Sequence, residues 1–156
     1  MDKFTGRVWV LGDDIDTDII IPTEYLALKT IDDMKQYGFS PLRPELAGQI
    51  QKGDIIVAGK NFGCGSSREQ APEIIKALGV QCVIAKSFAR IFFRNSINNG
   101  LLLIEQPDLH DNVKEGDQVT VVMNEHVDHN GKQYPIASLP ENLMDIIQAG
   151  GLVKAM

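Results

Sequence analysis

The hydrophobic positions in the middle of the chain predict an alternation of strands and helices. Continuous apolar runs of strand length lie at residues 54–58, 80–85 and 101–104. The segments between them, about residues 67–78 and 88–98, have apolar side chains at helical spacing. This order of strand, helix, strand, helix and strand predicts a partly parallel sheet with right-handed crossovers.

The C-terminal third has the pattern of antiparallel strands. Residues 118–122 predict one strand, and the segments 126–128 and 133–136 flank the turn sequence His-Asn-Gly-Lys, which is typical of a hairpin. A last helix is predicted from Pro140. We therefore expect an α/β fold in which an antiparallel β segment closes the core.

Length and composition indicate one domain and bear on the class of its partners. The chain has 156 residues without a linker or repeat, so we expect a single domain over residues 1–156. Its formal charge of −6 argues against nucleic acid or an acidic membrane as the main partner. With neither a signal segment nor an apolar run of membrane-spanning length, we expect a cytoplasmic protein.

The stretch at residues 59–72 joins a predicted strand to a predicted helix. Ser66 and Ser67 each have Glu or Gln three residues later, which is the pattern of a capping box. Only one of them can cap the helix, and Arg68 adds a fork that suits a carboxylate or phosphate. Because backbone N–H groups at a helix N-terminus favour an anion, these three residues predict an anion site. A plain helix cap is the alternative.

An acidic loop, residues 13–18, follows a first strand predicted at residues 7–12. Asp14, Asp16 and Asp18 have the spacing of a calcium loop. The sixth position is Ile instead of Gly, and the twelfth is Tyr instead of Glu. A polar turn held by Asx hydrogen bonds is the alternative.

Other catalytic chemistry is sparse. The three His and two Cys form no clustered ligand set, so no metal site is predicted in this chain. Two thiols are too few for an iron–sulfur cluster. No Ser-His-Asp set can be assigned. An anion-binding loop and an acidic loop without a complete catalytic apparatus fit half of an enzyme.

Three motifs resemble the swivelling domain of the aconitase superfamily. Residues 63–72, Gly-Cys-Gly-Ser-Ser-Arg-Glu-Gln-Ala-Pro, resemble its signature, and residues 12–18 and 87–100 agree with it. The whole chain is similar to the family of 3-isopropylmalate dehydratase small subunits. The resemblance implies a swivelling β/β/α domain, a mixed sheet or barrel with flanking helices.

The resemblance also implies a function and roles for residues. The family's hydro-lyase interconverts 2-isopropylmalate and 3-isopropylmalate by dehydration and rehydration, in leucine biosynthesis. A separate large subunit carries a 4Fe–4S cluster, and the small subunit holds no cofactor. By this resemblance Ser66 is the base, Ser67 and Arg68 bind substrate carboxylate, and Thr17 and Asp18 lie at the same site.

The resemblance places substrate choice in five residues, Tyr25, Leu26, Ala27, Leu28 and Lys29. Homoaconitase relatives have Arg where this chain has Ala27, so the apolar lining here suits an isopropyl group. An inward Lys29 would instead bind a third carboxylate. The alternatives are a small subunit of homoaconitase or of a dimethylmalate- or citraconate-type dehydratase. From other classes, a non-catalytic dicarboxylate-binding module and a calcium-binding regulatory domain also remain.

Overall fold

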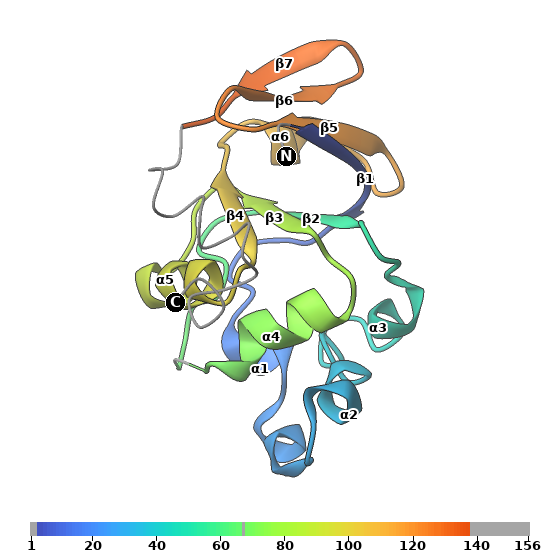
Figure 1. The fold of residues 1–156 in the computed structure, drawn as a ribbon, viewed down its shortest axis with the longest axis vertical. Coiled ribbons are helices and arrows are strands. Elements are labelled where there is room, and N and C mark those ends of the chain that lie inside the picture. Colours follow the sequence, from blue (N-terminus) through green and yellow to red (C-terminus); the bar gives the residue numbers. More distant parts are fainter. Residues whose placement is uncertain (1–2, 67, 138–156) are drawn as a thin grey trace.

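The computed structural model describes residues 3–66 and 68–137 (Figure 1). One seven-stranded sheet has the order β4-β3-β2-β1-β5-β6-β7. Its strands are β1 (Lys3–Val10), β2 (Ile55–Ala58), β3 (Cys82–Ala85), β4 (Leu102–Glu105), β5 (Gln118–Val122), β6 (His126–His129) and β7 (Lys132–Pro135). The helices are α1 (Thr17–Ile20), the 3-10 helix η1 (Thr23–Ala27), α2 (Ile31–Lys35), α3 (Leu46–Gln49), α4 (Gln70–Ala77), α5 (Arg90–Asn98) and α6 (Leu109–Asn112).

Strands β1 to β4 form the parallel half of the sheet, as the central pattern predicts. Both faces of β2 and β3 are covered, so all of their residues are buried and their sequences are continuously apolar. Successive side chains point to opposite faces. Ile56 therefore packs in one core with α4 and α5, whereas Ile55 packs in a second core with β5 and β6.

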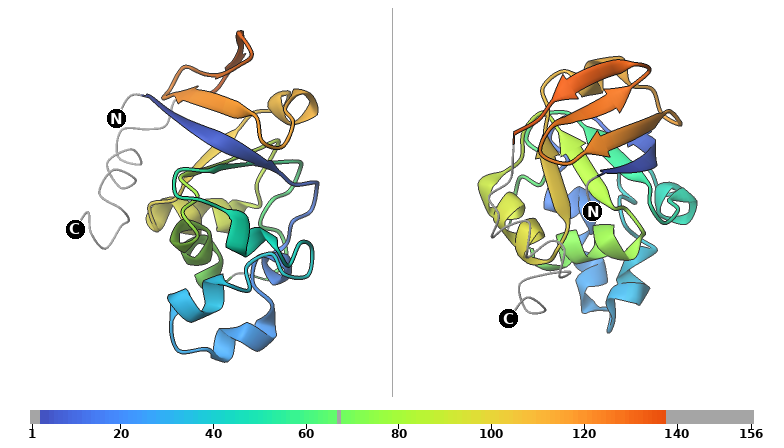
Figure 2. Two further views of the ribbon diagram at one scale, coloured as in Figure 1. Left: turned by 90° about the vertical axis from the view of Figure 1, so that its right-hand side faces the viewer. Right: turned by 45° about the horizontal axis from the view of Figure 1, so that its top comes forward.

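Strands β5 to β7 form the antiparallel half, which also agrees with the sequence pattern. Strand β1 joins the halves, because it pairs parallel with β2 and antiparallel with β5. Asn130 and Gly131 both have positive φ, 51° and 81°, as a two-residue type I′ turn requires. The sheet curls into a half-barrel, with α4 and α5 on the side away from β5 to β7 (Figures 1 and 2). The predicted mixed sheet with flanking helices is confirmed.

The predicted start of α4 is wrong. The helix begins at Gln70, and its N-cap Glu69 makes no side-chain cap hydrogen bond. Ser66 is therefore not the N-cap, and its hydroxyl bonds to no residue that the structure describes. The tertiary structure holds Ser66 in another way, because its backbone carbonyl accepts a hydrogen bond from the Thr17 hydroxyl. The helix predicted from Pro140 lies outside the described residues.

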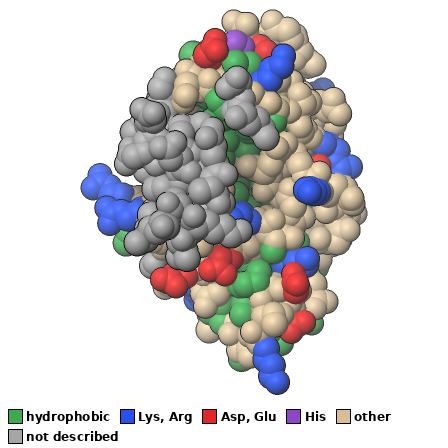
Figure 3. All heavy atoms as spheres, in the orientation of Figure 1, with side chains coloured by type: hydrophobic (Ala, Val, Ile, Leu, Met, Phe, Trp, Pro, Cys, Tyr) green, Lys and Arg blue, Asp and Glu red, His purple; other side chains and the backbone are tan. Residues whose placement is uncertain are grey.

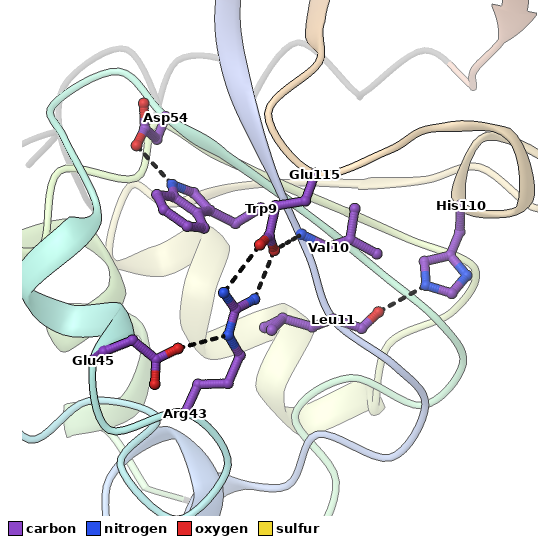
Figure 4. Close-up of polar contacts among 8 residues, drawn as sticks. All are labelled: Trp9, Val10, Leu11, Arg43, Glu45, Asp54, His110 and Glu115. Carbon is purple, nitrogen blue, oxygen red and sulfur yellow. Dashed lines mark hydrogen bonds and ion pairs between the residues drawn. The ribbon is translucent and has the colours of Figure 1, made fainter.

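A polar cluster ties the segment before β2 to β1 (Figure 4). The Arg43 guanidinium donates to both carboxylate oxygens of Glu115, at 2.6 and 3.0 Å, and to Glu45 at 3.2 Å. Glu115 in turn accepts from the Val10 N–H of β1. Nearby, the Trp9 indole N–H donates to the buried Asp54 carboxylate at 2.7 Å. The cluster thus fixes the strand that leads into the acidic loop.

The surface has mixed charge. On the face drawn in Figure 3, Lys and Arg side chains are scattered, with Asp and Glu between them. Within residues 3–66 and 68–137, no helix is both long and apolar enough to cross a membrane.

Candidate functional site

The acidic loop and the serine loop (residues 59–69) meet at the carboxyl ends of the neighbouring parallel strands β1 and β2. Three backbone hydrogen bonds join them, since Asp14 N–H donates to the Lys60 carbonyl, Thr17 N–H to that of Cys64 and Gly63 N–H to that of Ile15. Ligands bind open α/β sheets at this end of the strands. The fold thus brings together two loops that lie far apart in the sequence.

Thr17 positions Ser66. The Thr17 side chain is buried, and its hydroxyl donates to the backbone carbonyl of Ser66 at 2.6 Å. Ser66 itself is exposed, and its own hydroxyl makes no hydrogen bond with any residue that the structure describes. The preceding Gly65 has a φ of +88°, which favours glycine, so the backbone turns sharply just before the serine. Ser66 is therefore held by its backbone and presents a free hydroxyl.

Arg68 is held by three groups. Its Nη2 lies 2.6 Å from Asp18 Oδ1 and donates to the Thr23 hydroxyl at 2.8 Å. Its Nη1 donates to the Ile21 carbonyl at 3.1 Å. The Arg68 side chain is 13% exposed, whereas that of Asp18 is 64% exposed. Asp18 therefore orients a largely buried guanidinium. Thr23 was not predicted as part of the site, because only the tertiary structure reveals its contact.

The carboxylates of the acidic loop bind the protein itself. Asp16 accepts from the Ile19 N–H and caps α1, as an Asx turn does. The others bind three different partners, Asp13 the Lys60 N–H, Asp14 the Asn61 amide and Asp18 the Arg68 guanidinium. Across the described part of the chain, no three His, Cys, Asp or Glu side chains gather in a way that would hold a metal ion. The predicted polar turn therefore accounts for this loop.

A cleft of about 240 Å³ opens between the serine loop and the start of α5. Thr17 and Arg68 line one wall, with Gly65 between them. The second wall comes from α5 and the residue before it and consists of Ala89, Arg90, Ile91, Phe92 and Asn95. At Gly63, the Cβ atom of any other residue would collide with the Phe92 ring, so glycine allows α5 to pack this closely.

Sequence reasoning missed the α5 wall. The motif at residues 87–100 supports the resemblance, but no site residue was assigned to it. The spacing of its apolar residues predicts a helix and cannot show which loop the helix faces. The one signal in the sequence is an arginine next to an isoleucine, Arg90 and Ile91, at the start of that helix. The structure shows that both side chains are exposed.

The five predicted specificity residues do not line this cleft. Tyr25 stacks on Tyr37, with ring centroids 4.0 Å apart. Leu26 and Leu28 pack against the core, while Ala27 and Lys29 are exposed. The structure thus brings Thr17, Asp18 and Arg68 together beside Ser66 but leaves residues 25–29 apart. Ser67 lies outside the described residues.

Neither thiol lines the cleft. Burial, followed by the charges of Asp16 and Asp14, raises the pKa of Cys64. Cys82 is fully buried in β3, and burial strongly raises its pKa as well. Because the thiolate is the reactive form, a raised pKa makes both side chains weaker nucleophiles.

The fold and this cleft define a domain of the aconitase C-terminal type, and the model of the aconitase C-terminal domain family matches residues 19–109, more than half of the chain. A 3-isopropylmalate dehydratase small subunit of Lachnospira eligens is 80% identical over 99% of this chain and 94% of that protein. The 3-isopropylmalate dehydratase small subunit of Heliobacterium modesticaldum is 52% identical over 97% of this chain and 93% of that protein. A crystal structure of 3-isopropylmalate dehydratase from Methanocaldococcus jannaschii, 40% identical, has a TM-score of 0.91 and covers 98% of this chain and 92% of that one. The chain belongs to the family of 3-isopropylmalate dehydratase small subunits.

Proposed function

We propose that this chain is the small subunit of a cytoplasmic hydro-lyase that interconverts 2-isopropylmalate and 3-isopropylmalate in leucine biosynthesis. The names of its relatives support this reaction and a large-subunit partner. The observation that carries the proposal is a serine, Ser66, whose hydroxyl bonds to no described residue and which is held by Thr17, two residues before a fixed guanidinium. Thr17 and Arg68 line one cleft together with Gly65, the residue before the serine. The serine and the guanidinium are a proton-transfer group and a carboxylate anchor, which a dehydratase of hydroxy acids needs.

In this proposal Ser66 removes the proton from carbon. A serine hydroxyl is a weak base, so its alkoxide must be stabilised by nearby positive charge in a site without bulk water. Arg68, two residues along the chain and 13% exposed, supplies part of that charge. The cleft is open in this chain alone, and docking of the large subunit would exclude water from it. Thr17 acts as a positioning residue, because its hydroxyl holds the Ser66 backbone.

Arg68 and Ser67 bind a substrate carboxylate. The N–H groups of Arg68 on Nε, and one on Nη1, are not used by Asp18, Thr23 or Ile21. Asp18 is 64% exposed, so in this proposal an incoming carboxylate can displace it toward solvent. Asp18 then has two functions, since it orients Arg68 and yields to the substrate.

The chain has two thiols, of which Cys82 is buried in β3, whereas an iron–sulfur cluster is usually held by three or four thiolates. We assign the 4Fe–4S cluster to the large subunit, where it would supply the Lewis acid for the leaving hydroxyl. The contribution of this chain is then limited to binding, orientation and proton transfer.

We keep residues 25–29 as a proposed specificity segment, although they lie outside the cleft of the isolated chain. Arg68 bonds to Thr23, the first residue of η1, so this helix is attached to the carboxylate anchor. Closure against the large subunit would bring the exposed Ala27 toward the substrate. Ala27→Arg is expected to shift preference from isopropylmalate to tricarboxylic acids, measured as the ratio of kcat/KM values. An unchanged ratio removes this segment from substrate choice.

Reconstitution tests the proposed reaction. The chain is mixed anaerobically with its large subunit, and alkene formation is followed by ultraviolet absorbance from 3-isopropylmalate, homocitrate and dimethylmalate. We expect turnover only in the mixture, with the highest kcat/KM on isopropylmalate. A preference for homocitrate would indicate a homoaconitase subunit. Tight dicarboxylate binding without the partner, and no turnover with it, would indicate a binding module.

A further inference from the structure

We infer that α5 provides the second half of the substrate site, in which Arg90 binds the other substrate carboxylate and Ile91 contacts the alkyl group. This inference rests on the proposed function and names further substrate-binding residues for it. Both residues lie in the first turn of α5 and line the same cleft as Arg68 and Thr17.

The two arginines of the cleft differ in what they already bind. Both η nitrogens of Arg68 have protein partners, namely Asp18, Thr23 and the Ile21 carbonyl. Arg90 is exposed and makes no hydrogen bond or ion pair with any residue of the described ranges. Its whole fork is available for a carboxylate, which a guanidinium binds through two parallel hydrogen bonds. The cleft therefore has one guanidinium on each wall.

Ile91 provides the apolar contact that a branched alkyl group requires. It is 57% exposed, while the other large exposed hydrophobic residue of the described chain, Leu42, is 44% exposed and does not line the cleft. A single exposed apolar side chain is ordinary. Ile91, however, lines the cleft together with the Arg90 guanidinium and the partly buried Ala89. An alkyl malate has the same combination of carboxylates and apolar substituent.

The packing of α5 fixes the backbone that carries both side chains on the cleft wall. Phe92, the next residue, is buried, and its ring lies against Gly63 and 5.5 Å from the Phe62 ring. Since Gly63 belongs to the serine loop, the same contact fixes the distance between the two walls. The backbone at Arg90 and Ile91 is therefore positioned relative to the serine loop before any ligand binds.

The test for Arg90 uses Arg90→Gln, Arg90→Lys and the control Arg94→Gln, in the reconstituted two-subunit enzyme. Arg94 is exposed on the same helix but does not line the cleft, so its variant makes the same charge change elsewhere. We expect Arg90→Gln to raise the KM about tenfold or more, since it loses a charge-assisted hydrogen bond. The KM of Arg90→Lys should lie between those of the wild type and Arg90→Gln, and the KM of Arg94→Gln should match that of the wild type. An unchanged KM in Arg90→Gln overturns this role.

The test for Ile91 compares 3-isopropylmalate with 3-methylmalate, which lacks two methyl groups. Ile91→Ala should reduce the preference for the isopropyl compound, as a ratio of kcat/KM values, by about tenfold. Leu42→Ala is the control and should leave the ratio unchanged. Equal ratios in the wild type and Ile91→Ala overturn the alkyl contact.

The same surface would otherwise serve to dock the large subunit, so subunit affinity is measured for every variant. A weaker subunit affinity in Arg90→Gln, with an unchanged KM at saturating large subunit, assigns α5 to docking and overturns our inference. The acid with the highest kcat/KM in the wild type is used for all Arg90 variants. An unexpected preferred acid therefore changes the proposed function without affecting this comparison. If no acid on the panel is turned over, the dissociation constant of 3-isopropylmalate is compared instead, and no binding to the wild-type complex overturns both.

Discussion

Two arginines, Arg43 and Arg68, show how one kind of ion pair can stabilise a fold or prepare a site. Arg43 donates to Glu115 and Glu45, so its charge is more than matched by carboxylates (Figure 4). Arg68 meets one carboxylate, Asp18, and two neutral oxygens. Their side chains are 25% and 13% exposed, so burial does not separate them. What separates them is that Arg68 lines the cleft beside the serine loop and Arg43 does not.

The residues around the two ion pairs, Arg43–Glu115 and Arg68–Asp18, determine what each pair does. The Arg43 guanidinium lies 5.7 Å from the centroid of the Trp9 ring, and its bonds join residues 72 positions apart in the sequence. The Arg43 bond is the main cause that lowers the pKa of Glu115, and the Glu115 bond is the main cause that raises the pKa of Arg43. This pair is therefore satisfied internally. Each arginine uses three of its five N–H groups toward described residues, but Arg68 lines the cleft, where its remaining N–H groups can take a ligand.

The largest expected effect is at Ser66. Ser66→Ala should lower kcat by roughly 10²- to 10⁴-fold, the usual contribution of a proton-transfer group. The free energy of unfolding should not change, because the hydroxyl bonds to no described residue. Reconstituted turnover and urea unfolding measure the two effects. Ser40→Ala, which does not line the cleft, is the control. Retained activity in Ser66→Ala would remove this serine from the chemistry.

The same substitution at the two arginines should separate their roles. Arg68→Lys is expected to raise the KM about tenfold, because an ammonium replaces a fixed fork at the carboxylate anchor. Arg43→Lys should leave the KM unchanged and reduce stability slightly. Steady-state kinetics and urea unfolding of both variants test the comparison directly. Equal effects on KM would mean that Arg68 does not contact the substrate.

The parts of the fold that depend on local sequence patterns could be predicted from the sequence. The parallel strands were predictable, because burial on both faces makes residues 55–58 and 82–85 continuously apolar. The hairpin was predictable too, since Asn130 and Gly131 have the turn conformation that their sequence favours. Both signals are local.

The start of α4 and the second wall of the cleft were not predictable in this way. The Ser66 carbonyl takes its hydrogen bond from Thr17, 49 positions away, so a local capping pattern does not decide where α4 begins. The contact of Phe92 with Gly63 likewise depends on the packing of α5. Site residues inside a recognised signature could be proposed from the sequence. Arg90, whose role depends on which helix faces the loop, could not.

Breaking the Arg43 pair should affect stability alone. Arg43→Gln is expected to lower the free energy of unfolding by about 1 kcal/mol, because the pair is bidentate but only partly buried. A double-mutant cycle with Glu115→Gln isolates the interaction between the two side chains. The kcat/KM of the folded, reconstituted enzyme should stay the same. A loss of activity without a loss of stability would place this cluster in the functional machinery.

The smallest expected effect is on the pH dependence of stability. The pKa of Glu115 is lower in the folded chain than its ordinary value of 4.5, first because of the Arg43 hydrogen bond and then because of the Val10 N–H. The folded state therefore binds this proton less readily than the unfolded state. The stabilisation is present above about pH 4.5 and is lost as the pH falls through the folded-state pKa. Glu115→Gln should consequently lose less stability than the wild type between neutral pH and about pH 4, measured by urea unfolding. Arg68→Lys, which leaves this carboxylate paired, should keep the wild-type slope. If the free energy of unfolding depends on pH equally in Glu115→Gln and the wild type, Glu115 binds its proton equally in the folded and unfolded states. The pairing of Arg43 with Glu115 would then have no electrostatic effect on stability.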